Sequence, residues 1–416
     1  MTRDMKALDP LFVRGRFPAP LWEWAFFENA GGVYVPNSVI ERITAYMSQC
    51  QVQPGSNFPL AAKAQDRMNT GHARMAAMIG ADEDEVVIGP STSINAYVLA
   101  QALRPLWSDG DEVIVAIQNH EANSGPWRRL AASGIKVLDW PVHPETGTLD
   151  TAALAGLLSD RTRLVALPHV SNILDAINDA KAIAKLVHDA GAEVCVDGVA
   201  FAPHRAVDVR DWDVDYYLFS FYKIFGPHMG CLYGKRDKLV RAANQGHYFF
   251  ADDDTTHKLN PAGPQHEMIA ALQGIDDYFE ALAAYHLAAP ANDALARQRR
   301  LFELIGRHEE ELSRRFLDFV NGRDDIRLLG PASADRNTRV ATFSFTIEGR
   351  RSADIPALLA RQHVGVSSGH FYAKRLVEAL GVANADDGVV RASMAHYNTL
   401  DEVDRLIEAL DRALSN

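Results

Sequence analysis

The chain has 416 residues, 47% hydrophobic and 23% charged, which is an ordinary composition for a globular protein. That length is more than one core usually holds, so two domains are expected. The net charge of −12 and the lack of a basic run argue against nucleic acid or an anionic membrane as a partner. No stretch approaches about 18 apolar residues, and the N-terminus has no apolar signal core, so a cytoplasmic protein is expected.

The three cysteines, Cys50, Cys195 and Cys231, show neither a metal-ligand spacing nor a disulfide framework. Cys195 and Cys231 lie in apolar runs and are predicted to be buried thiols. This usage is typical of a reducing compartment. No metal site is expected.

Helices and strands are predicted to alternate along the first half of the chain. Residues 1–26 contain three prolines and are expected to be irregular. Helices are expected over about 37–49, 60–79, 95–103, after 127, and 180–190, and strands over 85–88, 112–116, 163–167 and 193–197. This rhythm predicts a mostly parallel sheet with helices on both faces.

The second half predicts a smaller unit. Helices are expected over about 266–288, 292–321, 353–362 and 400–414, and strands over 326–329, 339–345 and from 389. This alternation suggests a small α/β domain. We therefore expect a large domain over 27–290 and a small one over 291–416, with residues 1–26 packing against the small domain.

The most informative stretch is Leu218 to Gly230, where one lysine, Lys223, lies between a strand-like run and Gly226-Pro227. Its neighbours are aromatic and hydroxyl residues. A partly buried lysine has a lowered pKa and becomes a nucleophilic amine, as a Schiff base with an aldehyde requires. The alternative is a lysine at a strand end with its ammonium group in solvent.

An aspartate precedes this lysine by one predicted strand. Residues 193–197 form an apolar run that ends in Asp197, and ligands bind beyond the carboxyl ends of strands in open α/β sheets. Pyridoxal phosphate needs such a pair, because the carboxylate keeps the pyridine nitrogen protonated. Together with the pattern Ser220-x-x-Lys223-x-x-Gly226-Pro227, Asp197 predicts pyridoxal 5'-phosphate as the cofactor.

Residues 196–208 and 219–234 resemble the class V aminotransferase family, especially its cysteine desulfurase-like branch. The similarity extends from about Phe27 to about Leu406. It implies the aspartate-aminotransferase-type α/β fold, fold type I of the pyridoxal-phosphate-dependent transferases, with a large domain on a mostly parallel sheet and a small C-terminal domain. It also implies a homodimer, a Schiff base on Lys223, and Asp197 at the pyridine nitrogen.

The resemblance assigns further cofactor contacts. His120 corresponds to the histidine that stacks on the pyridine ring, although it could instead be a capping histidine. Asn172 corresponds to the asparagine at the phenolic oxygen. Ser91, and after it Thr92, are expected at the phosphate, where a helix start favours anions; helix capping is the alternative.

Other family positions hold different residues here. Ser220 and Tyr222 are expected to contact the cofactor, with Tyr222 replacing a phosphate-binding histidine. Gly263 occupies the place of a threonine that reaches the partner subunit's phosphate, so its backbone N–H would make that contact. Arg391 corresponds to the arginine that clamps the substrate α-carboxylate, a task suited to a planar guanidinium; a surface arginine in an edge strand is the alternative.

The turn at Asn29 and Ala30 resembles the one that lies near the substrate carboxylate in the family, and a plain turn before a helix is the alternative. Two further positions leave the family pattern. Where the desulfurase loop reads Thr-Gly-His-His-Cys-Ala, this chain has Ser-Gly-His-Phe-Tyr-Ala, so Tyr372 replaces the cysteine. Ala200 replaces a glutamine that touches the cofactor oxygen. A phenol cannot accept sulfur as a persulfide.

These residues predict a pyridoxal-phosphate-dependent enzyme that acts on an amino acid. Lys223 would serve as the base for the Cα proton. Without a loop thiol, we expect β-elimination, a carbon–sulfur lyase reaction on cysteine, cystine or a cysteine conjugate. A class V aminotransferase or epimerase is the first alternative, and a non-enzymatic regulator that binds the cofactor is the second.

Overall fold

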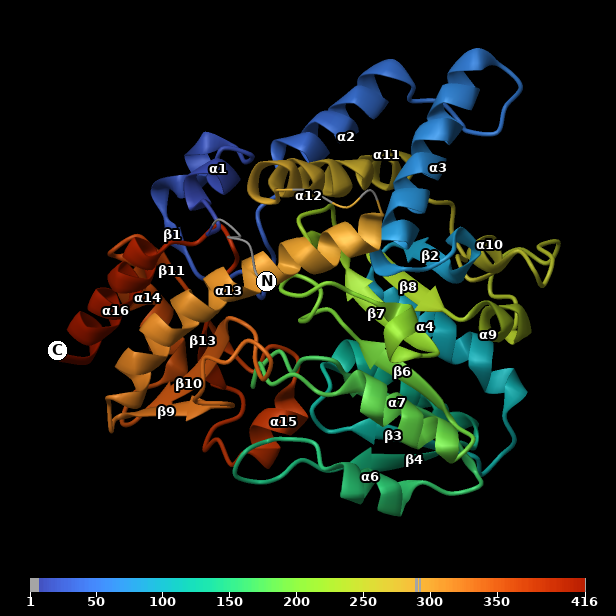
Figure 1. Cartoon of the computed structure of the whole chain (residues 1–416). Coiled ribbons are helices and arrows are strands. Elements are labelled where there is room, and N and C mark those ends of the chain that lie inside the picture. The colour runs from blue at the N-terminus through green and yellow to red at the C-terminus, as the bar shows by residue number, and fades with distance from the viewer. Residues whose placement is uncertain (1–6, 289–290, 292, 416) are drawn as a thin grey trace.

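A seven-stranded sheet forms the centre of the larger part of the molecule (Figure 1). The computed structural model describes residues 7–288, 291 and 293–415. The strand order is β2-β8-β7-β6-β5-β3-β4, and β8 is antiparallel to both of its neighbours while the other pairs are parallel. The strands are β2 (Val86–Gly89), β3 (Glu112–Ala116), β4 (Lys136–Trp140), β5 (Thr162–Pro168), β6 (Glu193–Asp197), β7 (Tyr216–Ser220) and β8 (Gly230–Gly234).

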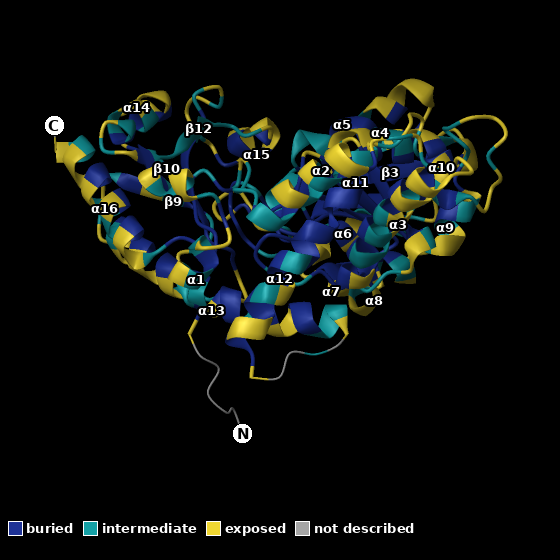
Figure 2. Cartoon of the chain, turned by 90° about the horizontal axis from the view of Figure 1, so that it is seen from above, coloured by how far each residue is buried: buried dark blue, intermediate teal, exposed yellow. Residues whose placement is uncertain are grey.

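Helices cover both faces of this sheet, and strand residues alternate between the two cores. In β5, Leu164 and Ala166 pack in one core, and Val165 and Leu167 in the other. The first core includes α4 (Thr92–Leu103), α5 (Gly125–Arg129) and α9 (Arg236–Arg241). The second includes α3 (Pro59–Ile79), α6 (Thr151–Leu157), α7 (Ala180–Asp189), α8 (Val209–Trp212), α11 (His266–Ala271) and α12 (Gln273–His286). Figure 2 shows buried residues concentrated in the sheet.

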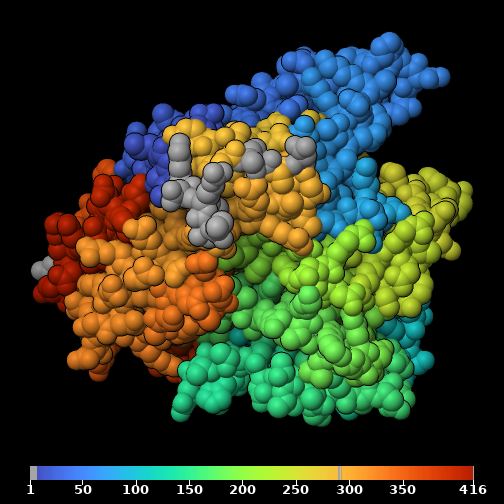
Figure 3. Space-filling model, viewed as in Figure 1, coloured from blue at the N-terminus to red at the C-terminus, as the bar shows by residue number. Residues whose placement is uncertain are grey.

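The C-terminal residues form a second lobe, orange to red in the space-filling view (Figure 3). Its antiparallel sheet has the order β12-β13-β10-β9, formed by β9 (Ile326–Leu329), β10 (Thr342–Ile347), β12 (Ser367–Gly369) and β13 (Val389–Ser393). The lobe also holds α14 (Ile355–Ala360), α15 (Lys374–Ala379) and α16 (Leu400–Ser415). The small domain is therefore antiparallel in its sheet, with helices packed on it.

Helix α13 (Ala294–Asn321) runs through both cores. Leu301 and Ile305 pack in the large core, whereas Leu312 and Phe316 pack in the small one. The helix therefore ties the two lobes together, and the division expected at residues 290–291 stays a prediction.

The N-terminal segment is more ordered than predicted. It contains α1 (Pro10–Arg14), a 3₁₀ turn (Ala19–Glu23) and β1 (Ala25–Phe26). Helix α1 forms because Asp9 caps it, accepting hydrogen bonds from the next turn, and Pro10 stands at its first position. Strand β1 pairs in parallel with β11 (Val364–Gly365) of the small lobe, whereas Phe17 packs on Tyr278 of α12.

Most predicted elements are confirmed, and the errors have local causes. The strands at 85–88, 112–116 and 193–197 and the helix α2 (Asn37–Gln49) are within a residue of the expected bounds. The helix expected over 266–288 is two helices separated by Leu272, and the one over 353–362 shortens to α14. The strand expected from residue 339 begins at Thr342, because the backbone N–H of Val340 donates to Asp175 instead.

Several elements were not predicted, including β4, α6, α9, α15 and the one-turn helix α10 (Thr255–Lys258). The mostly parallel sheet with helices on both faces is confirmed. Among the residues described, none of the helices has the length and apolar character needed to span a membrane.

Candidate active site

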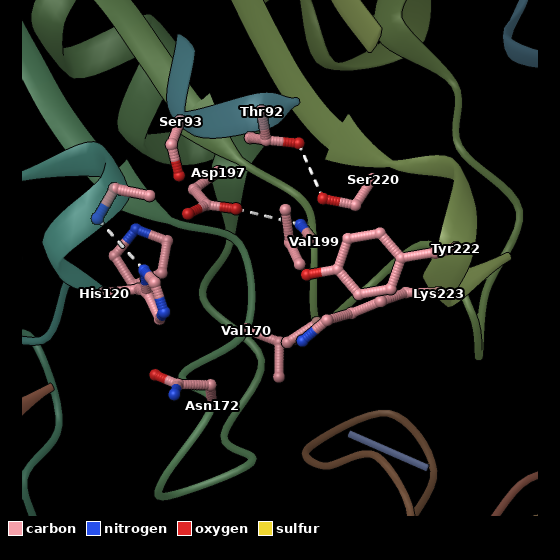
Figure 4. Close-up of a pocket in the computed structure, with 13 residues that line it drawn as sticks. Thr92, Ser93, His120, Val170, Asn172, Asp197, Val199, Ser220, Tyr222 and Lys223 are labelled. Atoms are coloured by element: carbon pink, nitrogen blue, oxygen red, sulfur yellow. Dashed lines mark hydrogen bonds between the residues drawn. The ribbon is translucent and has the colours of Figure 1, made fainter. Parts of the chain in front are cut away.

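One cavity lies at the carboxyl ends of the central strands and collects most of the predicted residues. Asp197 is the last residue of β6, Lys223 follows β7, Asn172 follows β5 and His120 follows β3. Figure 4 shows these four side chains turned toward one space. The cavity is lined by Thr92, Ser93, His120, Ala122, Pro168, Val170, Asn172, Asp197, Val199, Ala200, Ser220, Tyr222 and Lys223.

Lys223 ends a short 3₁₀ turn, Phe221–Lys223, that closes β7. Burial, and next the nearby Arg391 charge, lower its pKa from 10.5 to about 8, while Asp197 and Glu28 act in the opposite direction. Its Nζ donates a hydrogen bond to the carbonyl of Ala30. The amine is therefore held in place and easily deprotonated, as the predicted Schiff base requires.

Asp197 is buried between β5 and β7, its two parallel neighbours. Burial raises the pKa of its carboxyl to about 6, against the lowering effects of the Val199 N–H and of Lys223. The Val199 N–H donates to Oδ1 at 2.9 Å, and among the described residues nothing donates to Oδ2. A carboxylate left in this state gains most from a cationic partner in the cavity, such as a protonated pyridine nitrogen.

His120 both caps a turn and lines the cavity, so the two interpretations of it are compatible. Its Nδ1 accepts a hydrogen bond from the N–H of Ala122 at 3.0 Å, which leaves the ring proton on Nε2. Burial lowers the pKa of the imidazole to about 3, with further lowering by Lys223 and Arg391. The ring is therefore neutral and suited to stacking.

The start of α4 brings two hydroxyl residues to the cavity, Thr92 and Ser93. Thr92 Oγ1 lies 2.7 Å from Ser220 Oγ. Ser91 is the N-cap: its Oγ accepts from the Ile94 N–H at 3.2 Å, and it is absent from the cavity lining. The helix approaches β8 this closely because Gly230 has no side chain; a Cβ there would lie 2.3 Å from the Thr92 nitrogen.

A second cavity adjoins the first and holds Arg391 of β13. One guanidinium nitrogen donates to the Asn172 carbonyl at 3.2 Å, and the Phe371 ring lies 3.6 Å from Cζ. Burial lowers the pKa of Arg391 to about 10. Its Nε is buried and has no hydrogen bond partner among the described residues, and the same holds for Oδ1 of Asn172, so both atoms can still bind a ligand.

Asn29 and Ala30 differ in what they face. The Asn29 amide donates to the Phe26 and Ser393 carbonyls and to Asn398, and its oxygen accepts from the Tyr397 hydroxyl. All of its polar atoms therefore hold the fold together. Ala30 lines the second cavity with its backbone. Gly263 lies in an exposed loop and is absent from the lining of both cavities.

Tyr372 stands in the loop at the position where the resemblance to desulfurases implies a cysteine. Its side chain is 69% exposed and lines the second cavity. The loop is anchored, since the Asn172 amide donates to the Phe371 carbonyl at 2.9 Å and the Glu121 N–H to that of Tyr372 at 2.8 Å. The three cysteines are buried and line neither cavity. Burial also raises the pKa of Cys195 and Cys231, so neither favours a thiolate.

Of the lining residues that were not predicted, Ser93, Phe371 and Glu28 contribute most to the chemistry of the cavities. Ser93 stands in the same run of hydroxyl residues as Ser91 and Thr92, so the signal that indicated those two residues also applied to Ser93. Glu28 directly precedes the Asn29 turn that was singled out. No signal in the sequence indicated that Phe371 would cover the guanidinium of Arg391.

These residues fit pyridoxal phosphate: a deprotonatable lysine, a buried carboxylate, a neutral imidazole and hydroxyls at a helix start surround one cavity. Within the described residues, no cluster of three metal-binding side chains occurs. Ala200 lines the cavity, and its methyl side chain cannot donate a hydrogen bond.

Comparison with known proteins agrees with this fit. The "Aminotransferase-like protein FGM3" of Gibberella zeae is 37% identical over 410 residues, covering 97% of this chain and 98% of that protein. The "Cysteine desulfurase-like protein ustD" of Aspergillus flavus is 32% identical, covering 98% and 91%. The crystal structure of the cysteine desulfurase CsdA from Escherichia coli superposes with a TM-score of 0.81 at 28% identity, covering 99% of both chains.

The fold agrees with these neighbours as well. Cysteine desulfurases have the fold type I architecture expected from the sequence, with the same mostly parallel central sheet. The family model described as Aminotransferase class-V matches residues 25–406. The chain therefore belongs to the class V aminotransferase family and is a pyridoxal-phosphate-dependent enzyme.

Proposed function

We propose that this enzyme is a lyase that eliminates a group from Cβ of an amino acid, with cysteine, cystine or a cysteine conjugate as the substrate class. The observation that carries this proposal is Tyr372 in the loop beside the cavity, together with three cysteines that line neither cavity. Sulfur transfer through a protein persulfide needs an accessible thiolate. Elimination needs none, because the leaving group departs from the substrate itself.

The substrate side of the proposal rests on Arg391. Its guanidinium lines the second cavity and would grip the α-carboxylate with two parallel hydrogen bonds. Phe371 holds the plane of the guanidinium by stacking at 3.6 Å. An amino acid held in this way has its amino group and Cα directed toward Lys223, which lines both cavities.

Lys223 would move the Cα proton. With a pKa of about 8, roughly a tenth of the amine is neutral at pH 7 and able to accept that proton. The bound cofactor supplies the electron sink that makes the Cα–H bond acidic, with Asp197 at its pyridine nitrogen. Overall, a thioether conjugate and one water give pyruvate, ammonia and the free thiol, whereas cysteine releases hydrogen sulfide and cystine releases S-thiocysteine in place of the thiol, so no external oxidant or reductant is needed.

Pyruvate release tests this proposal directly. The purified enzyme is incubated with L-cystine and with S-alkyl cysteines, and pyruvate, ammonia and the sulfur product are measured, which is S-thiocysteine from cystine and the thiol from S-alkyl cysteines. Equimolar release without an added 2-oxo acid supports elimination. Dependence on a 2-oxo acid would instead indicate an aminotransferase, and racemised substrate without pyruvate an epimerase.

The role of the cysteines has a separate test. The triple variant Cys50→Ser, Cys195→Ser, Cys231→Ser is expected to retain turnover, with some loss of stability because all three sites are buried. Mass spectrometry after incubation with cysteine is expected to show no persulfide. A persulfide on any cysteine, with stoichiometric alanine release, would contradict the proposal and indicate a desulfurase.

We also propose a homodimer in which the loop around Gly263 reaches the partner's phosphate site. The support is that this loop is exposed and that no atom lies within 4 Å of where a Gly263 Cβ would be, which leaves its backbone N–H approachable. Light scattering measures the mass. A monomer with full cofactor affinity would contradict this assembly.

A further inference from the structure

Glu28 places a carboxylate in the cavity that holds Arg391 and Lys223. Its Oε1 lies 3.6 Å from the guanidinium, and its side chain is 34% exposed. The backbone is fixed by a β-bridge between Glu28 and Ser393, two residues along β13 from Arg391. A carboxylate and the arginine that binds a substrate carboxylate are therefore built side by side.

The fold makes room for this carboxylate. It lies over Gly31, where a Cβ would stand 2.3 Å from Oε1. The Gly31 N–H donates to the Glu28 carbonyl at 3.0 Å and closes the turn beneath it. Among the described residues, none donates a hydrogen bond to the carboxylate, and Arg391 is its ion-pair partner. Glu28 thus keeps its hydrogen-bonding capacity for the cavity.

A substrate α-carboxylate on Arg391 changes what Glu28 faces. The guanidinium charge is then shared with the substrate, so Glu28 gains an anionic neighbour. If the substrate side chain is neutral, the carboxylate of Glu28 and the α-carboxylate of the substrate lie side by side. An anionic substrate side chain adds a third negative charge. A cationic group beyond Cβ offsets both, because opposite charges attract and the cavity is only partly open to solvent.

Further ionisable residues line this cavity, among them Asp386 and His370. Asp386 lines it, but its carboxylate is held by Lys374 at 2.5 Å. His370 also lines it, and its Nδ1 accepts from the Tyr372 N–H at 3.2 Å. Neither residue supplies a free cation to compensate Glu28. Arg391 and Lys223 also line this cavity, but in the proposed function the first binds the substrate carboxylate and the second binds the cofactor, so no further cation remains for Glu28 among the described lining residues.

We propose that Glu28 is the specificity-determining carboxylate of this site and selects amino acids whose side chain carries an ammonium group. The inference rests on the proposed function in one respect, that Arg391 holds the α-carboxylate. Within the cysteine conjugates, it names the cationic ones as the preferred class.

Three thioethers of nearly equal length test the assignment: S-(2-aminoethyl)-L-cysteine, S-propyl-L-cysteine and S-(2-carboxyethyl)-L-cysteine. The measurement is kcat/KM for pyruvate release, and separately the Kd by calorimetry with the Lys223→Ala variant, which cannot turn the compounds over. The wild type is expected to prefer the cationic compound over the neutral one by roughly 5- to 30-fold, with the anionic one last.

Glu28→Gln keeps the shape of the side chain and removes its charge. It is expected to bring the cationic-to-neutral ratio to about one, in kcat/KM and in Kd, with an unchanged melting temperature. The matched control is Asp386→Asn, which is expected to change the ratio less than about twofold because Lys374 already neutralises that carboxylate.

The outcomes separate the two proposals. Equal ratios in the wild type, a preference that survives Glu28→Gln, or equal tightening of all three compounds would overturn the role of Glu28; the last result would mean that Glu28 merely competes for Arg391. A cationic preference in Kd that Glu28→Gln abolishes, without pyruvate from any compound, would retain Glu28 and overturn the elimination.

Discussion

At the residue scale, Lys223 combines chemical usefulness with a free-energy cost to the fold. Its pKa falls from 10.5 to about 8, so below pH 8 the folded state holds a charge that the unfolded state solvates better. This destabilisation is fully present below about pH 8 and disappears as the pH rises to about 10.5. The amine is reactive because the protein solvates its charge poorly.

The first prediction follows from this sign. In the cofactor-free protein at pH 7, Lys223→Met is expected to raise the free energy of unfolding by roughly 3 kcal/mol, because the pKa of Lys223 falls from 10.5 to about 8 and one pKa unit corresponds to about 1.4 kcal/mol. The gain should shrink between about pH 8 and pH 10.5. Urea denaturation measures it, with the exposed Lys185→Met as control. A variant less stable than the parent at pH 7 would contradict the burial argument.

Asp197 carries the second prediction at this scale. Asp197→Asn is expected to lower kcat roughly 10²- to 10³-fold at saturating cofactor, because it removes the charged partner of a buried ion pair. Ser91→Ala, outside the cavity, is the comparison and should leave kcat nearly unchanged. Equal rates for Asp197→Asn and the wild type would remove Asp197 from the pyridine nitrogen.

At the element scale, the N-terminus of α4 divides two tasks between adjacent hydroxyls. Ser91 caps the helix and Thr92 lines the cavity. Ser91→Ala is therefore expected to lower stability by about 1 kcal/mol with the cofactor Kd unchanged. Thr92→Val should weaken cofactor binding roughly tenfold or more, because a hydrogen bond to a charged group is lost. Fluorescence titration and urea denaturation separate the effects; the reverse pattern would return the phosphate to Ser91.

At the scale of the whole molecule, Phe17 packs the N-terminal segment into the large core, against α12 and the residues that follow β13. Its ring contacts Tyr278 of α12 at 5.3 Å and Tyr397, which follows β13, at 5.4 Å. Phe17→Ala is expected to cost roughly 3–5 kcal/mol of stability, since it opens a cavity at this junction. Leu11→Ala, 79% exposed, is the control and should change little. A small loss for Phe17→Ala would show that the segment packs loosely.

The sequence predicted what local patterns encode. Strands β3 and β6 are short apolar runs, and Asp197 and Lys223 stand in a motif with a chemical rationale. For β8, whose residues are Gly-Cys-Leu-Tyr-Gly, the apolar run around Cys231 indicated a strand but not its bounds or its antiparallel pairing, which packing against β2 and β7 decides. The sequence also assigned Asn29 a ligand role, whereas that side chain binds the backbone of β13.

The substrate cavity was harder to predict for the same reason. Glu28 and Arg391 are far apart in sequence and come together because the segment after β1 bridges to β13, through Glu28 and Ser393. Neither the periodicity of apolar residues nor the spacing of motifs predicts such a long-range contact. Ser91 and Thr92 show that the sequence does not decide between neighbouring residues. The resemblance to the family favoured Ser91 at the phosphate, whereas in the structure Thr92 lines the cavity and Ser91 does not.

The chain order of the two cavities has a consequence for synthesis. All strands of the large sheet lie between residues 86 and 234, so Asp197 and Lys223 leave the ribosome well before Arg391. The substrate cavity closes only when β13 returns to the N-terminal segment, where the Ser393 N–H donates to the Phe27 carbonyl at 2.7 Å. Domains generally fold as they emerge, N-terminal parts first. A chain halted before β13 would therefore carry the reactive lysine without Arg391, and without the strand whose Ser393 pairs with Glu28.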